Sequence, residues 1–338
     1  MRAYLIIIIV SIITSGCTKT SIQMENTKDG EGFWLIPRDE VLNSFENRDG
    51  IVSIDTPMFT LADKVQFLHE TDLVFSVKEN NIVKVYPIKI LQGHEIVNDS
   101  INDIYFSVTY CPLTRSGICI NRKINNKVTE FGVSGMLYND NLMPYDRNTE
   151  SIWSQMLGRC VNGELIDEQV ATIMMITTNW QTIKTAYPEA LVLTDDGFYN
   201  CDCGLKNDGF GDGETSDNTD GFLPGGNFYG IVSNFKVVLY SYESLNDQLS
   251  GIRENNILIG NGAFDYISVF KRNSQASFSI VQDSLPIVLK DSEGNSWDMF
   301  GYALDGPKKG RRLETFYSYS ASLWAWEEFY QVDKVHEF

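Results

Sequence analysis

The stretch that decides the fold class is Ile104-Tyr105-Phe106-Ser107-Val108-Thr109-Tyr110. All of its residues except Ser107 are aromatic or β-branched, a composition that favours a β-strand. Strand-like segments recur before and after it, whereas the predicted helices are few and short. The sequence therefore predicts a β-rich α+β protein.

Short elements are predicted on both sides of this strand. Residues 73–77 and 82–86 should pair as a β-hairpin around the turn at residues 79–81. Asn179 is a suitable N-cap for a helix. The spacing of apolar residues predicts short helices over residues 61–69, 88–96 and 179–186.

The two halves of the chain share landmarks in the same order. These are the segments 83–91 and 236–245, the strand-closing Arg122 and Arg272, and the equally spaced pairs Trp153–Trp180 and Trp297–Trp324. We interpret them as the remains of an ancient internal duplication. The alternative is that a β-rich chain repeats tryptophan and tyrosine at strand spacing without any duplication.

A duplication predicts two related lobes packed about a pseudo-twofold axis, with short helices in each. Residues 32–199 would form the first lobe and residues 227–338 the second. Residues 200–226 are crowded with Gly, Asp and Asn and lack apolar periodicity, so they are expected to form an acidic loop between the lobes.

The N-terminus has the pattern of a bacterial lipoprotein signal. Arg2 precedes an apolar run over residues 4–13. This run is too short to cross a bilayer, since a spanning helix needs about 20 apolar residues. Gly16-Cys17 supplies the small residue and the thiol that cleavage and lipid attachment require. Thr14 is a departure, because such signals more often carry leucine there.

We therefore expect a signal peptide over residues 1–16, lipid on Cys17 and a flexible tether over residues 17–31. The protein would work in the bacterial cell envelope, facing the periplasm or the cell surface, and would bind the membrane through the lipid on Cys17. An ordinary signal with a chance cysteine, or an uncleaved anchor, are the alternatives.

The charge and the cysteine content indicate which partners and which disulfides the protein can have. The formal net charge is −18, without a run of Lys or Arg, so the surface should repel nucleic acid and anionic lipid head groups. Once Cys17 carries lipid, an odd number of cysteines is left, so at least one thiol stays unpaired. The pairing is open among Cys111, Cys119, Cys160, Cys201 and Cys203.

Several blocks resemble the family named domain of unknown function 3179. They include Tyr86-Pro87, His94-Glu95-Ile96-Val97-Asn98-Asp99, Thr109-Tyr110-Cys111-Pro112-Leu113 and Trp324-Ala325-Trp326. The resemblance runs from about residue 36 to residue 330. It implies an envelope location and a shared architecture but no established activity. Some relatives carry a second cysteine where this chain has Thr114, so a two-cysteine motif cannot form here.

The first half holds the residues that could carry chemistry. Cys111 ends a strand, and His94 with Glu95 could activate its thiol for nucleophilic catalysis or join it in binding a transition metal. The candidate ligand-binding residues nearby are Asn98, Asp99, Thr114 and Arg122. The alternative is that Cys111 is a buried thiol and that His94 bonds a backbone carbonyl.

The acidic loop offers a weaker candidate for a calcium site. Its carboxylates do not match the helix-loop-helix calcium spacing, so a solvated loop is the favoured interpretation. The candidates are Asp208, Asp212 and Asp217, with Glu214 and Asp220 nearby.

Two functions follow from the sequence. The first is an envelope lipoprotein that binds a small ligand or partner in a cleft between its lobes. The second is a thiol-dependent enzyme, redox protein or metal-binding protein that uses Cys111 and His94. The sequence indicates no particular cofactor.

Overall fold

A computed structural model describes residues 25–26, 32–44, 47–194, 227–242, 249–252, 256–262, 264–272, 275–281 and 284–336. The predicted signal peptide, Cys17 and the acidic loop with Asp208, Asp212 and Asp217 lie outside these residues. The predicted tether does too, except for residues 25–26. Within the described part of the chain, no helix is both long and apolar enough to cross a membrane.

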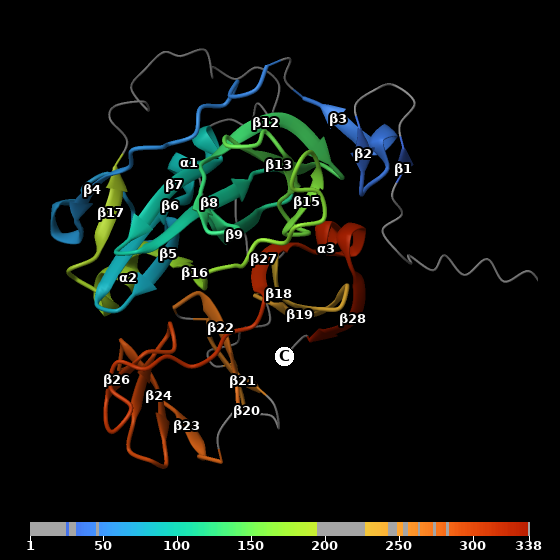
Figure 1. Ribbon diagram of the computed structural model, residues 1–338. Coiled ribbons are helices and arrows are strands. Elements are labelled where there is room, and N and C mark those ends of the chain that lie inside the picture. The colour runs from blue at the N-terminus through green and yellow to red at the C-terminus, as the bar shows by residue number, and fades with distance from the viewer. Residues whose placement is uncertain are drawn as a thin grey trace, which may run out of the picture.

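A central sheet of seven strands contains elements from both halves of the chain (Figure 1). One antiparallel pairing joins the halves, with Ser320 opposite Gly117. The strands, in spatial order, are β28 (Gln331–His336), β19 (Lys236–Ser241), β18 (Asn227–Ser233), β27 (Ser318–Ser322), β9 (Ser116–Asn121), β8 (Ile104–Cys111) and β7 (Ile96–Ile101).

The N-terminal sheet covers one face of the central sheet. Phe131, Leu142 and Trp153 of this sheet share a core with Ile118 and Tyr319 of the central sheet. Its strands, in spatial order, are β1 (Glu25–Asn26), β2 (Phe33–Trp34), β15 (Arg159–Asn162), β14 (Ile152–Ser154), β13 (Asn141–Asp146), β12 (Phe131–Tyr138) and β3 (Val41–Asn43).

The hairpin sheet packs on the opposite face of the first-half strands. Phe75 and Tyr86 from this sheet lie in one core with Val108 and Tyr110 of the central sheet. The strands are β16 (Met175–Asn179), β5 (Leu73–Glu79), β6 (Ile82–Pro87), β17 (Leu191–Thr194) and β4 (Met58–Leu61).

Smaller elements complete the fold. A three-stranded sheet consists of β20 (Leu249–Ile252), β21 (Asn256–Asn261) and β22 (Tyr266–Lys271), and a four-stranded sheet of β23 (Phe278–Ile280), β24 (Ile287–Asp291), β25 (Ser296–Asp298) and β26 (Ala303–Asp305). The ribbon β10 (Lys123–Ile124) and β11 (Lys127–Val128) stands apart. The helices are α1 (Ile88–His94), α2 (Trp180–Ala186) and α3 (Leu323–Phe329), with 3-10 turns η1 (Arg38–Glu40) and η2 (Ala62–Lys64).

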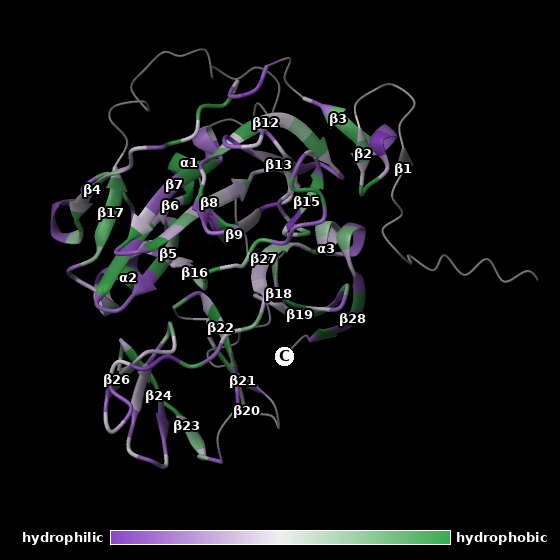
Figure 2. Ribbon diagram, viewed as in Figure 1, coloured by the Kyte–Doolittle hydropathy of each residue, from purple (hydrophilic) through white to green (hydrophobic). Residues whose placement is uncertain are grey.

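The β-rich α+β class is confirmed, and hydrophobic residues lie along many of the strands (Figure 2). The predicted hairpin and two of the three predicted helices are present, and the Asn179 side chain accepts a hydrogen bond from the Thr182 N–H at the start of α2. The helix predicted over residues 61–69 is wrong. Only η2 forms there, because the preceding residues pair with β17 as β4.

A buried ion pair joins the two halves. Lys78 of β5 bonds the Asp298 carboxylate at the end of β25, and both side chains are almost fully buried. The Lys78 ammonium also lies 5.1 Å from the ring centre of Tyr187 and 5.2 Å from that of Tyr302. Breaking such a pair leaves an uncompensated buried charge, so it fixes the first half against the second.

The central and hairpin sheets approach each other closely at Gly117. A Cβ atom there would collide with the Phe75 ring. Gly117 also stands opposite Ser320 in the pairing that joins the halves. The position therefore requires glycine for steric reasons.

Gly117→Ala should lower the free energy of unfolding by about 1–3 kcal/mol, the usual range for overpacking a core. Chemical denaturation monitored by circular dichroism measures the change. Phe75→Leu makes room for the methyl group, so adding it to Gly117→Ala should recover part of the loss. An unchanged stability of the single variant would contradict this account of the sheet contact.

Candidate functional site

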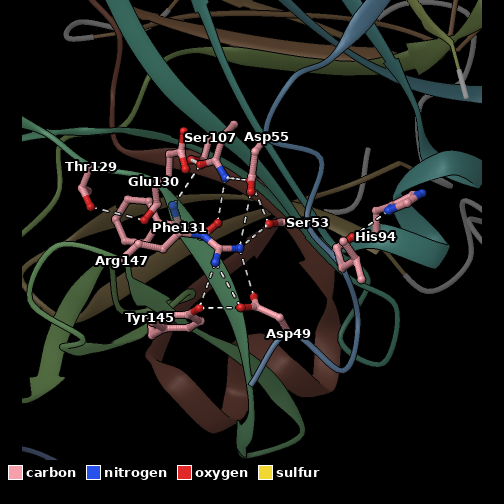
Figure 3. Close-up of polar contacts among 12 residues, drawn as sticks. Asp49, Ser53, Asp55, His94, Ser107, Thr129, Glu130, Phe131, Tyr145 and Arg147 are labelled. Atoms are coloured by element: carbon pink, nitrogen blue, oxygen red, sulfur yellow. Dashed lines mark hydrogen bonds and ion pairs between the residues drawn. The ribbon is translucent and has the colours of Figure 1, made fainter. Parts of the chain in front are cut away.

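A polar cluster holds residues 47–55, here called the strap, against the two large sheets (Figure 3). Arg147 donates from both terminal nitrogens to the Asp49 carboxylate at 3.1 Å and from Nη2 to Ser53 Oγ at 3.0 Å. The Tyr145 hydroxyl donates to Asp49 at 2.6 Å. Arg147 lies 3.5 Å from Asp55. These bonds hold the strap against the end of β13.

Asn98 connects the strap to three strands. Its Nδ2 donates to Asp55 at 2.7 Å and to the Phe131 carbonyl at 2.8 Å. Its Oδ1 accepts from Ser107 Oγ at 2.5 Å and from the Phe131 N–H at 3.0 Å. The Asn98 side chain is 1 % exposed, and both its amide nitrogen and its amide oxygen are bonded within the protein. Asn98 therefore has a structural role.

Asp99 and Arg122 also bond within the protein. The Asp99 carboxylate accepts from Lys84 Nζ at 2.8 Å and from the Tyr86 hydroxyl at 2.7 Å. Burial and the Asp99 charge together raise the Tyr86 pKa. Arg122 donates to the carbonyls of Asp99 and Thr129, and burial lowers its pKa.

Cys111 and His94, the predicted thiol and imidazole pair, have different hydrogen-bond partners. His94 Nδ1 lies 2.7 Å from the Val52 carbonyl of the strap. Cys111 is 1 % exposed, and its Sγ donates to the Asp140 carbonyl at 3.4 Å. Burial raises the Cys111 pKa, although hydrogen bonds from Thr114 oppose that effect. The thiol is therefore held neutral.

Glu95 is the ionisable residue whose charge affects the pKa of the Cys111 thiol. It follows α1 with φ of 57°, a left-handed conformation that is uncommon for residues other than glycine. Burial raises the pKa of its carboxyl to about 7. The Glu95 charge in turn contributes to the raised pKa of Cys111.

Thr114 belongs to a buried network of neutral side chains beneath Cys111. The Asn141 amide donates to Thr114 Oγ1 and Ser116 Oγ at 3.0 Å and to Gln155 Oε1 at 2.7 Å. The Gln155 amide donates to Thr109 Oγ1 at 2.8 Å. All five residues are buried, so the network contributes to specificity more than to net stability.

A second polar layer lies on the opposite face of the central sheet, where β9, β16 and β27 meet. Ser318, Ser320 and Ser322 occupy alternate positions of β27 and so point to one face. Ser318 Oγ and the Tyr229 hydroxyl are 2.7 Å apart, and Ser320 Oγ and the Tyr242 hydroxyl are 2.8 Å apart. We call this layer the polar seam.

The polar seam borders a small cavity that both halves line. The lining comes from residues 117–119, 172, 173, 175 and 177 of the first half and from residues 318–320 of the second. Its volume is about 10 Å³, which is room for about one water molecule. The strands around it meet near the centre of Figure 1.

The three described cysteines, Cys111, Cys119 and Cys160, are buried thiols without a disulfide. Cys201 and Cys203 lie outside the described residues. In the part of the chain that the structure describes, no group of three or more His, Cys, Asp and Glu side chains is placed to hold a metal ion.

Sequence reasoning found the strand residues and missed their partners. Asp49, Ser53 and Asp55 of the strap lie far in sequence from Arg147, and the serines of β27 look like ordinary strand residues. The one available signal was alternation, because Ser318-Tyr319-Ser320-Ala321-Ser322 alternates polar and apolar residues.

The comparisons with known proteins identify a family. Residues 48–332, which are most of the chain, match the model of a family described as protein of unknown function (DUF3179). Neither the curated proteins nor the solved structures contain a match to the chain.

The Glu95 carboxyl should make stability depend on pH. Its pKa is about 7 in the folded protein against 4.5 ordinarily, so the folded state binds this proton more tightly. The stabilisation is complete below about pH 4.5 and is lost as the pH rises through about 7. Glutamine does not titrate, so Glu95→Gln should not show this loss. The difference in free energy of unfolding between Glu95→Gln and wild type should therefore shift in favour of the variant by up to about 3 kcal/mol from about pH 5 to about pH 8.

Denaturant unfolding at the two pH values measures this difference. Glu164→Gln, at an exposed position, is the matched control and should follow wild type. A Glu95→Gln variant whose stability relative to wild type is the same at both pH values would contradict the raised pKa.

Proposed function

We propose that this chain, which belongs to the DUF3179 family of proteins of unknown function, is a lipid-anchored protein of the bacterial cell envelope that binds a small ligand at the seam between two related halves. The observation that carries the proposal is the cavity beside the polar seam, which residues of both halves line. The cavity has room for about one water molecule, so a ligand would bind by parting the two halves along the seam. Buried polar groups at a junction are the kind of feature that fixes the orientation of a small ligand.

Repeated strand pairing supports the duplication. In the first half, β16 lies antiparallel to β5 of a hairpin and β17 parallel to β6, with α2 between β16 and β17. In the second half, β27 and β28 take the same places beside the hairpin β18–β19, with α3 between them. A three-stranded and a four-stranded run follow each hairpin in the same order.

Matching side-chain contacts support it further. The Trp153 indole N–H donates to Asp146 at 3.1 Å, and the Trp297 indole N–H donates to Asp291 at 3.0 Å. Arg122 and Arg272 also behave alike, since each follows a strand and donates to a backbone carbonyl further along the chain, that of Thr129 and that of Ala276. This similarity favours a scaffold role for Arg122 over ligand binding.

One landmark does not match. Trp180 is the first residue of α2 and is 2 % exposed, whereas Trp324 is the second residue of α3 and is 42 % exposed. The equal spacing of the two tryptophan pairs is therefore no evidence for the duplication.

The two halves differ at buried positions where the first half has polar side chains. The register of β8 with β9 and of β21 with β22 makes Thr109 correspond to Ile259 and Ser116 to Tyr266. Met299 corresponds to Gln155, because each stands two residues after its tryptophan, Trp297 or Trp153. A buried network in one copy and apolar packing in the other favours specialisation of the first half.

The thiol alternative receives less support. A reactive cysteine needs an accessible thiolate, and Cys111 is buried with a raised pKa. Its imidazole candidate, His94, bonds the strap. Glu95 does not favour this alternative either, because its charge adds to the raised pKa of the Cys111 thiol.

The anchor is tested by Cys17→Ser, with Thr18→Ala as the matched control. In a bacterial expression host, wild type and the control should incorporate labelled palmitate and sediment with membranes. Cys17→Ser should do neither. Continued labelling of Cys17→Ser would refute lipid attachment at this position.

The seam is tested by filling its cavity. Thr172→Leu adds bulk to the cavity lining, whereas Thr172→Val keeps the original size and serves as control. A panel of small neutral, anionic, cationic and zwitterionic metabolites is screened by thermal shift against all three proteins. A ligand of the seam should raise the Tm of wild type and Thr172→Val and leave Thr172→Leu unchanged. The proposal fails if no compound raises the Tm, or if every effect survives in Thr172→Leu.

A further inference from the structure

Two facing side chains at one end of the polar seam leave three polar atoms without a partner. Asn227 of β18 stands opposite Ser322 of β27 in the antiparallel pairing. Asn227 is 0 % exposed and Ser322 is 5 % exposed. Neither Nδ2 nor Oδ1 of Asn227, nor Oγ of Ser322, has a hydrogen-bond partner among the described residues.

In the equivalent pair of the first half, the polar side chain has a hydrogen-bond partner. Leu73 takes the place of Asn227, and Asn179 takes the place of Ser322. Asn179 Oδ1 accepts from the Thr182 N–H at 2.9 Å, whereas Ser322 makes no such bond to α3. The same fold position thus tolerates an apolar residue, and Asn227 is not required by the fold.

A buried polar group without a partner destabilises a protein by about 1–3 kcal/mol. Native proteins almost always provide that partner, from the chain or from an internal water molecule. Three such atoms on adjacent side chains therefore point to a common ligand.

The chemistry of the three atoms selects the ligand. The Asn227 amide offers one acceptor and one donor group, and the Ser322 hydroxyl can do either. A single water molecule donates and accepts at the same time, and buried waters make about three hydrogen bonds. An ion would satisfy only one kind of group and would need a counter-charge. Further along the same row, the cavity beside Ser318 and Ser320 has room for about one water molecule.

We propose that Asn227 and Ser322 form a binding site for an internal water molecule, which extends the polar seam to the start of α3. This inference does not depend on the seam binding a ligand. It assigns Asn227 a role that Leu73, its counterpart, cannot fill.

Oxygen-17 magnetic relaxation dispersion on the full-length protein counts long-lived internal waters. Asn227→Leu introduces the residue of the first half and should reduce the dispersion amplitude by about one water molecule. Asn148→Leu, at an exposed position, is the control and should keep the wild-type amplitude.

Ser322→Ala is the second variant, in case Asn227→Leu does not fold. It removes one of the three partners and should lose the water or shorten its residence time. Wild-type amplitude and residence time in either folded variant would overturn the proposal.

Discussion

The pairing of β9 with β27 is the constraint on which the rest of the structure depends. It is the only strand contact that makes one central sheet out of strands from both halves of the described chain. The hairpin sheet can approach this junction because Gly117 has no side chain. Ser320, directly opposite, is part of the polar seam. The junction thus decides where the two halves meet and which buried polar groups they share.

Much of the fold could be predicted from local patterns. The strand around Phe106 and Val108 and the hairpin before it follow from composition and alternation, which act over a few residues. Residues 61–69 show the limit of that approach. Their apolar spacing is helical, but residues 58–61 pair with the distant strand β17, and only a short 3-10 turn follows that pairing.

The site was harder to predict, because its partners are distant in sequence. Nothing near His94 identifies the Val52 carbonyl, and nothing near Asn98 identifies Asp55. The sequence left Cys111 open between a reactive thiol and a buried one. Burial, which decides whether a thiol can react, depends on sheet packing that no short pattern reveals.

The junction also governs how the chain can be made. β9 leaves the ribosome long before β27, so the nascent first half carries an unpaired strand edge until β27 has been synthesised. Exposed edges of this kind recruit other chains. A fragment that ends before β27 should therefore aggregate, because its β9 edge never finds the strand that covers it.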